Sequence, residues 1–325
     1  MLMTMIEALN HSLTLELERD KRVVVFGQDI GVNGGVFRVT EHLQEKFGEQ
    51  RVFDTPLSES AIIGSAVGMS VYGLRPVAEI QFAGFLFVCM NQLVSQAARI
   101  RFRSAGAYTC PLVVRAPYGG GVRTPELHSD SLEGVFLQTP GLKVVIPSNP
   151  YDAKGLLKAA VRDNNPVLFF EHKFLYRRIK GEVPTEDYTV PIGKAVVRRE
   201  GKHLTIISYA AMMHTSLEAA EALAEEGIEA EVIDLRTLLP LDEETILNSV
   251  KKTNKCLVVH EDTRTGGIAG EIAAILFEKA FDDLDGPLVR VTSLDTPVPY
   301  APTLEEHFLP NAKKVFSAAK ELARY

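Results

Sequence analysis

Glu59 is the residue in this chain whose chemistry is hardest to explain by packing alone. It stands directly before residues 60–73, a stretch without any charged side chain, which predicts a buried helix. A lone buried carboxylate is costly, so an acid at the mouth of this helix must be paired, solvated or protonated. Two interpretations stay open: an ordinary first-turn acid in a helix capped by Thr55 with Pro56 at its first position, or a carboxyl group kept for acid–base chemistry.

A second candidate is His128, in residues 116–133. Three successive glycines early in this segment suit a loop that approaches a ligand closely. Histidine is the side chain whose pKa best suits proton transfer near neutral pH, and hydroxyl and carboxyl groups surround it in the sequence. The alternative is a surface loop in which Ser129 or Asp130 caps a helix.

Three further groups carry weaker signals. Gln81 and Phe85 follow the predicted strand 76–80 and could position and stack on a ring, although Phe85 could equally belong to the core. Residues 162–166 join a helix to a strand with carboxylate, amide and carbonyl oxygens that suit a monovalent cation, although an Asn-Pro turn explains them as well. Residues 260–262, His-Glu-Asp, suit an anion or partner site or a purely structural role.

The elements that must position these groups alternate along the chain. In the first half the predicted strands are 22–26, 76–80, 111–115, 143–146 and 167–170, and the predicted helices are 4–18, 58–72, 85–103 and 151–162. In the second half the predicted strands are 204–209, 230–235, 256–261 and 288–292, and the predicted helices are 213–226, 242–252, 267–281 and 312–323. Short apolar strands separated by helices are typical of parallel sheets covered on both faces.

A polar stretch with two prolines, 176–191, interrupts this alternation and predicts a linker. We therefore expect an α/β protein with two doubly wound domains, residues 1–185 and 186–325.

Composition excludes several other classes. The chain has 325 residues, of which 46% are hydrophobic and 24% charged, as in a soluble globular protein. A net charge of −7 argues against general nucleic-acid or membrane binding, and no signal peptide is expected at the N-terminus. The three cysteines are scattered, so we expect no disulfide framework and a reducing, cytoplasmic location. Dinucleotide, P-loop and zinc-protease motifs are absent.

The motifs together resemble a known family. The matching stretches are 26–40, 51–60, 75–82, 116–134, 141–157, 167–177, 231–242 and 295–300. They resemble the beta subunit of the thiamine-diphosphate-dependent decarboxylase component of 2-oxoacid dehydrogenase complexes, closest to the pyruvate members. The resemblance implies a thiamine-diphosphate pyrimidine-binding fold followed by a transketolase C-terminal-like domain.

The resemblance also implies roles for individual residues. Glu59 matches the glutamate that hydrogen-bonds N1′ of the cofactor's aminopyrimidine, and Gln81 and Phe85 match positions that line the pyrimidine pocket. His128 matches a histidine expected to orient the lipoyl group and supply protons during acyl transfer. Five positions match the family's structural potassium site, mostly through backbone carbonyls: Leu112, Ala160, Val161, Asp163 and Asn165.

The cofactor's diphosphate–Mg²⁺ motif, Gly-Asp-Gly followed by Asn, is absent from this chain. The resemblance therefore implies that an alpha subunit holds Mg²⁺ and the diphosphate, in an α2β2 heterotetramer docked onto a lipoyl acyltransferase core.

Small departures from the family pattern keep the substrate open. Gln28 stands where the family usually has Glu, which puts any role of that acid in doubt. Residues 125–130 resemble pyruvate members, whereas residues 265–267 resemble branched-chain members. Pyruvate is favoured. The alternatives are a branched-chain 2-oxoacid dehydrogenase or acetoin dehydrogenase beta subunit, a transketolase-like subunit, and a non-catalytic partner-binding module.

Overall fold

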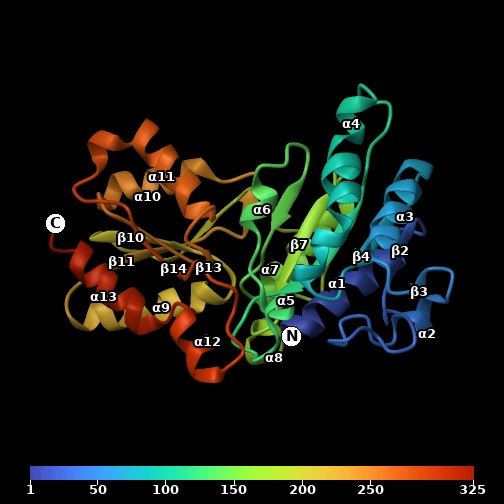
Figure 1. Ribbon diagram of the computed structural model, residues 1–325, viewed down its shortest axis with the longest axis horizontal. Coiled ribbons are helices and arrows are strands. Elements are labelled where there is room, and N and C mark those ends of the chain that lie inside the picture. The colour runs from blue at the N-terminus through green and yellow to red at the C-terminus, as the bar shows by residue number, and fades with distance from the viewer. The chain divides into compact units, whose positions relative to one another are not determined.

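A computed structural model describes all residues, 1–325 (Figure 1). The chain divides into two compact units. Unit 1 comprises residues 1–118 and 138–192, and unit 2 comprises residues 119–137 and 193–325. Each unit contains a sheet flanked by helices, so the predicted α/β class is confirmed.

Unit 1 is built on parallel strands in the spatial order β6-β7-β5-β4-β2-β3. Their bounds are β2 Val23–Gly27, β3 Val52–Asp54, β4 Arg75–Glu79, β5 Val113–Tyr118, β6 Lys143–Val145 and β7 Val167–His172. The central strands are buried along their whole length, because helices cover both faces of the sheet. A separate antiparallel pair joins β1 Leu2–Thr4 to β8 Lys180–Glu182.

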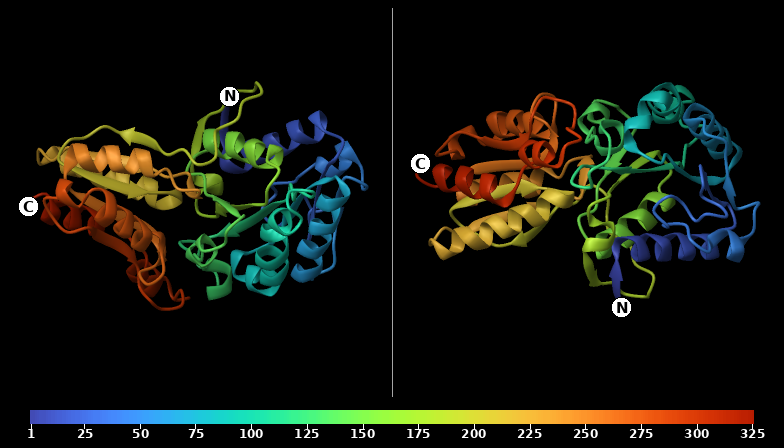
Figure 2. Two further views of the ribbon diagram at one scale, coloured as in Figure 1. Left: turned by 90° about the horizontal axis from the view of Figure 1, so that it is seen from above. Right: turned by 60° about the horizontal axis from the view of Figure 1, so that its bottom comes forward.

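The helices of unit 1 form two layers, one on each face of its sheet (Figure 2). One layer holds α1 Met5–Arg19 and α7 Pro150–Arg162, and the other holds α3 Glu59–Tyr72 with the segment 83–103. Asn149 caps α7, since its Oδ1 accepts from the Asp152 N–H at 2.9 Å. Shorter helices are α2 Leu43–Phe47, α4 Ile100–Arg103 and α8 Leu175–Arg178.

The start of α3 differs from the prediction. Its N-cap is Ser58 rather than Thr55. Thr55 cannot serve because its N–H donates to the Gly27 carbonyl at 3.0 Å and continues the pairing of β3 with β2. The prediction that this helix is buried is also wrong for one of its faces. The exposed residues of α3 are Ala61, Gly64, Ser65, Gly68 and Tyr72.

The predicted helix 85–103 is not continuous. It consists of the 3₁₀ turns η1 Ala83–Cys89, the π-helical turn η2 Asn91–Gln96, a further 3₁₀ turn η3 Ala97–Arg99, and α4. The run from Gly84 to Val88 is rich in residues of low helix propensity, and packing against α3 sets its backbone.

The predicted linker is docked onto α7 rather than free. The Lys154 ammonium donates to the Pro184 and Glu186 carbonyls and lies 4.9 Å from the Tyr188 ring centroid. Asp187 pairs with Lys158 and Arg162, which lower the pKa of its carboxyl group to about 2. Residues up to 192 therefore group with unit 1.

Unit 2 contains a sheet in the order β14-β13-β10-β11-β9, in which only β9 is antiparallel to its neighbour. Helices α10 and α11 cover one face, and α9 and α13 cover the other (Figure 1). The bounds are β9 Val196–Arg199, β10 Leu204–Ser208, β11 Ala230–Asp234, β13 Cys256–Thr263, β14 Val289–Ser293, α9 Ala210–Glu225, α10 Glu243–Thr253, α11 Ile268–Lys279, α12 Pro302–Phe308 and α13 Ala312–Leu322. A short strand β12 spans Thr237–Leu239.

Residues 119–137 belong to unit 2, whereas the sequence assigned them to a domain ending at 185. They contain α5 Glu126–Ser129 and α6 Gly134–Leu137. Hydrogen bonds to acidic residues of β13 and α12 hold this segment in unit 2. The domain division at residue 185 stays a prediction.

Candidate functional site

Glu59 is the first residue of α3 and is half-buried. A carboxylate at a helix N-terminus is favoured by the helix dipole. The Glu59 side chain makes no hydrogen bond or ion pair with any other residue of the chain. Its neighbourhood is the segment 83–89, because the Ser60 hydroxyl donates to the Val88 carbonyl at 2.6 Å. Burial and, second, the charge of Glu59 raise the pKa of the Cys89 thiol to about 12.

Gln81 and Phe85 lie close together in the sequence, just after the end of β4. The Gln81 amide donates to Asp29 Oδ2 at 2.9 Å, which fixes its side chain to the loop after β2. Phe85 meets Phe82 edge-on, with ring centroids 5.9 Å apart. Phe82 in turn packs edge-on against Phe37, at 5.7 Å. Both predicted pocket residues are half-buried, so neither is a fully enclosed core residue.

A buried ion-pair network lies beneath this aromatic cluster. The Arg115 guanidinium donates to both carboxylate oxygens of Glu171, at 2.6 and 2.7 Å, and to Glu79 Oε2 at 2.6 Å. The Tyr176 hydroxyl donates to Glu171 at 2.6 Å, and its ring contacts Phe37 at 5.3 Å. Burial disfavours the charged guanidinium, but Glu171 and Glu79 outweigh it and raise the pKa of Arg115. Sequence reasoning missed this network.

His128 lies in unit 2, half-buried in the short helix α5. Its backbone N–H donates to the Pro125 carbonyl at 2.9 Å, and the Thr124 hydroxyl lies 3.4 Å from its carbonyl oxygen. Ser129 does not cap a helix, because its hydroxyl donates to the Thr124 carbonyl at 2.9 Å. Backbone bonds therefore fix the turn that presents the imidazole.

Several buried acids, Glu133, Glu261 and Asp262, belong to the same unit as this turn. Glu133 is fully buried, and its Oε1 accepts from the Tyr209 hydroxyl at 2.7 Å. Burial and the nearby Asp262 carboxylate raise the pKa of Glu133 well above its usual value. Burial also raises the pKa of Asp262 to about 6 and lowers that of His260 to about 4. The acids of the 260–262 segment bind the chain's own amides, which favours the structural interpretation of this segment.

The five residues predicted for the potassium site lie at the C-terminus of α7 and beside it, in unit 1. Arg75 Nη1 donates to the Val161 and Asp163 carbonyls, both at 2.9 Å, so these two oxygens converge on one positive charge. The Leu112 carbonyl accepts from the Val167 N–H at 2.9 Å, and that of Ala160 from the Asp163 N–H at 3.2 Å. Each carbonyl oxygen keeps a second lone pair.

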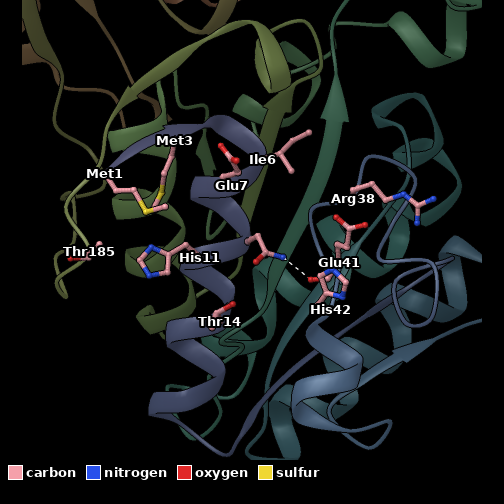
Figure 3. A pocket seen from close by; sticks show the side chains of 11 residues that line it. Met1, Met3, Ile6, Glu7, His11, Thr14, Arg38, Glu41, His42 and Thr185 are labelled. Carbon is pink, nitrogen blue, oxygen red and sulfur yellow. Dashed lines mark hydrogen bonds between the residues drawn. The ribbon is translucent and has the colours of Figure 1, made fainter.

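The cavity described next contains none of the predicted site residues. A cavity of about 390 Å³ in unit 1 lies between α1 and the loop with Arg38, Glu41 and His42 (Figure 3). Asn10 is one of its lining residues and donates to the Val39 and Glu41 carbonyls. No group of three or more His, Cys, Asp or Glu side chains is arranged to hold a metal ion. None of the helices has the length and apolarity needed to span a lipid bilayer.

Comparison with known proteins places these features in context. Residues 2–178 match the transketolase pyrimidine binding domain family, and residues 193–315 match the transketolase C-terminal domain family. The chain is 55% identical over 324 residues to the 2-oxoisovalerate dehydrogenase subunit beta of Bacillus subtilis strain 168. It is 53% identical over 323 residues to the pyruvate dehydrogenase E1 component subunit beta of the same organism. Each alignment covers 99% of both chains.

A solved structure shares the fold at lower sequence identity. It is a split-gene transketolase, described as an inactive beta4 tetramer, with a TM-score of 0.81 and 23% identity. The alignment covers 99% of this chain and 98% of the transketolase chain. The predicted fold class, a pyrimidine-binding domain followed by a transketolase C-terminal-like domain, is confirmed.

Proposed function

Because the chain belongs to the family of 2-oxoacid dehydrogenase E1 beta subunits, we propose that it forms the pyrimidine-binding half of a thiamine diphosphate site. The observation that carries this proposal is Glu59. A half-buried carboxylate without a partner in its own chain, at a helix N-terminus, is available to a ligand. Gln81 and Phe85, which follow β4, offer an amide and an aromatic face that fit a flat heteroaromatic ring.

Glu59, Gln81 and Phe85 of unit 1 have different roles in this proposal. When bound, thiamine diphosphate supplies the electron sink for breaking the bond between the carbonyl and carboxylate carbons of the 2-oxoacid. Glu59 donates or shares a proton at the ring nitrogen N1′, which is general acid–base catalysis. Phe85 packs against the ring, and the hydrogen bond to the Asp29 carboxylate holds the Gln81 side chain in one orientation.

His128 serves the second half of the reaction in this proposal. Acyl transfer to a lipoyl group reduces its disulfide and requires a proton at the departing sulfur. An imidazole on a turn with fixed backbone can deliver that proton and orient the lipoyl group.

An alpha subunit completes the site. We propose that it holds Mg²⁺ and the diphosphate, in an α2β2 heterotetramer docked onto a lipoyl acyltransferase core. The chain alone is then expected to have no activity with a 2-oxoacid, and mixing it with its alpha partner is expected to produce turnover. Reduction of an artificial dye acceptor measures this activity, and calorimetric titration with thiamine diphosphate measures binding.

Turnover by the isolated chain would contradict the shared site. If the mixture of both chains fails to bind thiamine diphosphate, the non-catalytic partner-binding module is the better interpretation.

We propose pyruvate as the first substrate, because residues 125–130 resemble the pyruvate members. A branched-chain 2-oxoacid is the second candidate, favoured by residues 265–267 and by the 55% identity to the 2-oxoisovalerate dehydrogenase subunit. The ratio of kcat/KM for pyruvate and for 3-methyl-2-oxobutanoate separates the two.

We also propose a structural potassium ion at the C-terminus of α7. A helix C-terminus favours cations, and the carbonyl oxygens of Leu112, Ala160, Val161 and Asp163 each have a second lone pair. Exchanging choline for K⁺ at constant ionic strength is expected to raise the Tm of the chain by about 2–4 °C, equivalent to about 1 kcal/mol of binding energy.

Scanning calorimetry measures this shift. The Asp163→Asn variant, which removes a negative charge from the loop, is expected to show a smaller shift. Equal Tm values in K⁺ and in choline would rule the ion out.

A further inference from the structure

We propose that two buried acids of unit 2, Glu261 and Glu305, are positioning residues for His128, because they hold the backbone of the loop that presents the imidazole. This inference rests on the proposed role of His128 in acyl transfer. Residues 120–131 are called the His128 loop below. Neither acid lies near His128 in the sequence, and neither was predicted to act in the reaction.

The first observation is that one carboxylate oxygen joins both ends of the His128 loop. Glu261 Oε1, at the end of β13, accepts a hydrogen bond from the Gly120 N–H and a second one from the Ser131 hydroxyl, the latter at 3.1 Å. Next to this junction, the Gly119 N–H donates to the Asp130 carbonyl at 3.2 Å. The loop is therefore closed at its base by one oxygen of Glu261 and by a backbone hydrogen bond.

The second observation is that Glu305 holds the next residue of the same loop. Its Oε1 accepts from the Gly121 N–H at 2.8 Å. Gly121 has a φ of +78°, a conformation that glycine adopts at low cost, so two consecutive amides can point toward two carboxylates. Glu305 belongs to α12, a separate element from β13, so the loop is anchored to two elements of unit 2.

The third observation is that the chain beyond the loop is anchored in the same way. The Gly134 N–H donates to Asp262 Oδ2 at 2.8 Å, and the Tyr209 hydroxyl donates to Glu133. A Cβ at Gly134 would lie 2.8 Å from that Asp262 oxygen, so only glycine allows this approach. The loop is thus fixed both at its base and just after it.

Burial gives these contacts their strength. Glu261 is 5% exposed and Glu305 is 3% exposed. The low polarity around these two buried side chains strengthens their hydrogen bonds, because water screens the interactions little. Their donors in the loop are two backbone amides and the Ser131 hydroxyl, and no metal-binding group is formed by these acids. The hydrogen bonds of Glu261 and Glu305 therefore stabilise one conformation of the loop.

The functional consequence follows from the requirement for alignment in proton transfer. A donor must lie within hydrogen-bond distance of its acceptor, and a shift of about 1 Å can reduce the rate about 100-fold. Without its hydrogen bonds to Glu261 or Glu305, the His128 loop spends less time in the conformation that places the imidazole for proton transfer. The rate of acyl transfer then falls, while cofactor chemistry at Glu59 continues.

The test uses the complete complex of this chain with its alpha partner. Glu305→Ala is expected to lower the kcat for acyl transfer to a lipoyl domain at least tenfold, with the KM for the 2-oxoacid and the rate with an artificial dye acceptor nearly unchanged. Glu305→Gln, which keeps an acceptor oxygen, is expected to recover part of the rate. Glu306→Ala is the matched control, since Glu306 is the exposed neighbour on the same helix.

Two further measurements separate positioning from a general structural effect. Hydrogen exchange at residues 119–121 is expected to be at least tenfold faster in Glu305→Ala than in the parent complex. In a double-mutant cycle with His128→Ala, the substitution at Glu305 is expected to have no additional effect on acyl transfer.

The outcomes distinguish this inference from the function on which it rests. If His128→Ala keeps normal acyl transfer, the role of His128 and its positioning by the acids are both overturned. If His128→Ala loses transfer while Glu305→Ala and Glu261→Ala keep it, only the positioning role is overturned. Additive effects in the double-mutant cycle, or unchanged hydrogen exchange, overturn the positioning role as well.

Discussion

Replacing Glu59 by Gln is expected to lower the rate of 2-oxoacid decarboxylation by about 10²- to 10⁴-fold, the usual contribution of a general acid–base group. An amide keeps the size of the side chain and can still hydrogen-bond a ring nitrogen. It cannot exchange a proton with that nitrogen at neutral pH, so the cofactor stays bound without being activated. The complex with the alpha partner, saturated with thiamine diphosphate and Mg²⁺, is the correct sample for this measurement.

The same substitution is expected to leave stability almost unchanged. Glu59 is half-buried and has no partner in the chain, and such positions usually change stability by less than about 0.5 kcal/mol. Glu49→Gln, at an exposed acid, is the control for loss of charge. Full activity of Glu59→Gln with bound cofactor would refute the role assigned to Glu59.

Replacing Arg115 by Met is expected to destabilise unit 1 by about 3–5 kcal/mol, because it leaves two buried carboxylates without their cation. Glu79 is 2% exposed and Glu171 is fully buried, so water cannot replace the guanidinium. Burial already raises the pKa of Glu79, and loss of Arg115 removes the charge that opposes this effect. Urea unfolding followed by circular dichroism measures the change, since the chain has no Trp for fluorescence.

Two comparisons make this prediction specific. Arg177→Met, at an exposed arginine of the same unit, is expected to change the free energy of unfolding by less than about 0.5 kcal/mol. A triple variant with Arg115→Met, Glu79→Gln and Glu171→Gln is expected to regain part of the lost stability, because no uncompensated charge stays buried. A loss below 1 kcal/mol in Arg115→Met would show that the network contributes little.

The helices and strands that were predicted correctly are determined by residues close to one another in the sequence. Apolar strands such as 167–170 and helices such as 151–162 follow from hydrophobic periodicity and from capping at Asn149. The sequence also identified the family, and thereby the fold and a 2-oxoacid dehydrogenase beta-subunit role.

The predictions that failed depended on contacts distant in sequence. Thr55 is a good N-cap residue by type, but it pairs with the end of β2 instead. The helix 85–103 is interrupted where it packs against α3. Short strands such as β3 and β8 have only three residues, too few to produce a period.

The sequence by itself therefore determined which residues are chemically suited to a site: Glu59 at the head of an uncharged helix, an amide and a ring after a strand, and His128 in a glycine-rich loop. The tertiary structure decided what holds them. Arg115 meets Glu79 and Glu171 because parallel pairing aligns β4, β5 and β7, although these residues lie 36 and 56 positions away from it. Glu261 and Glu305 reach the His128 loop across 141 and 184 positions. Local sequence patterns report propensity and periodicity, whereas such contacts depend on how the whole chain packs.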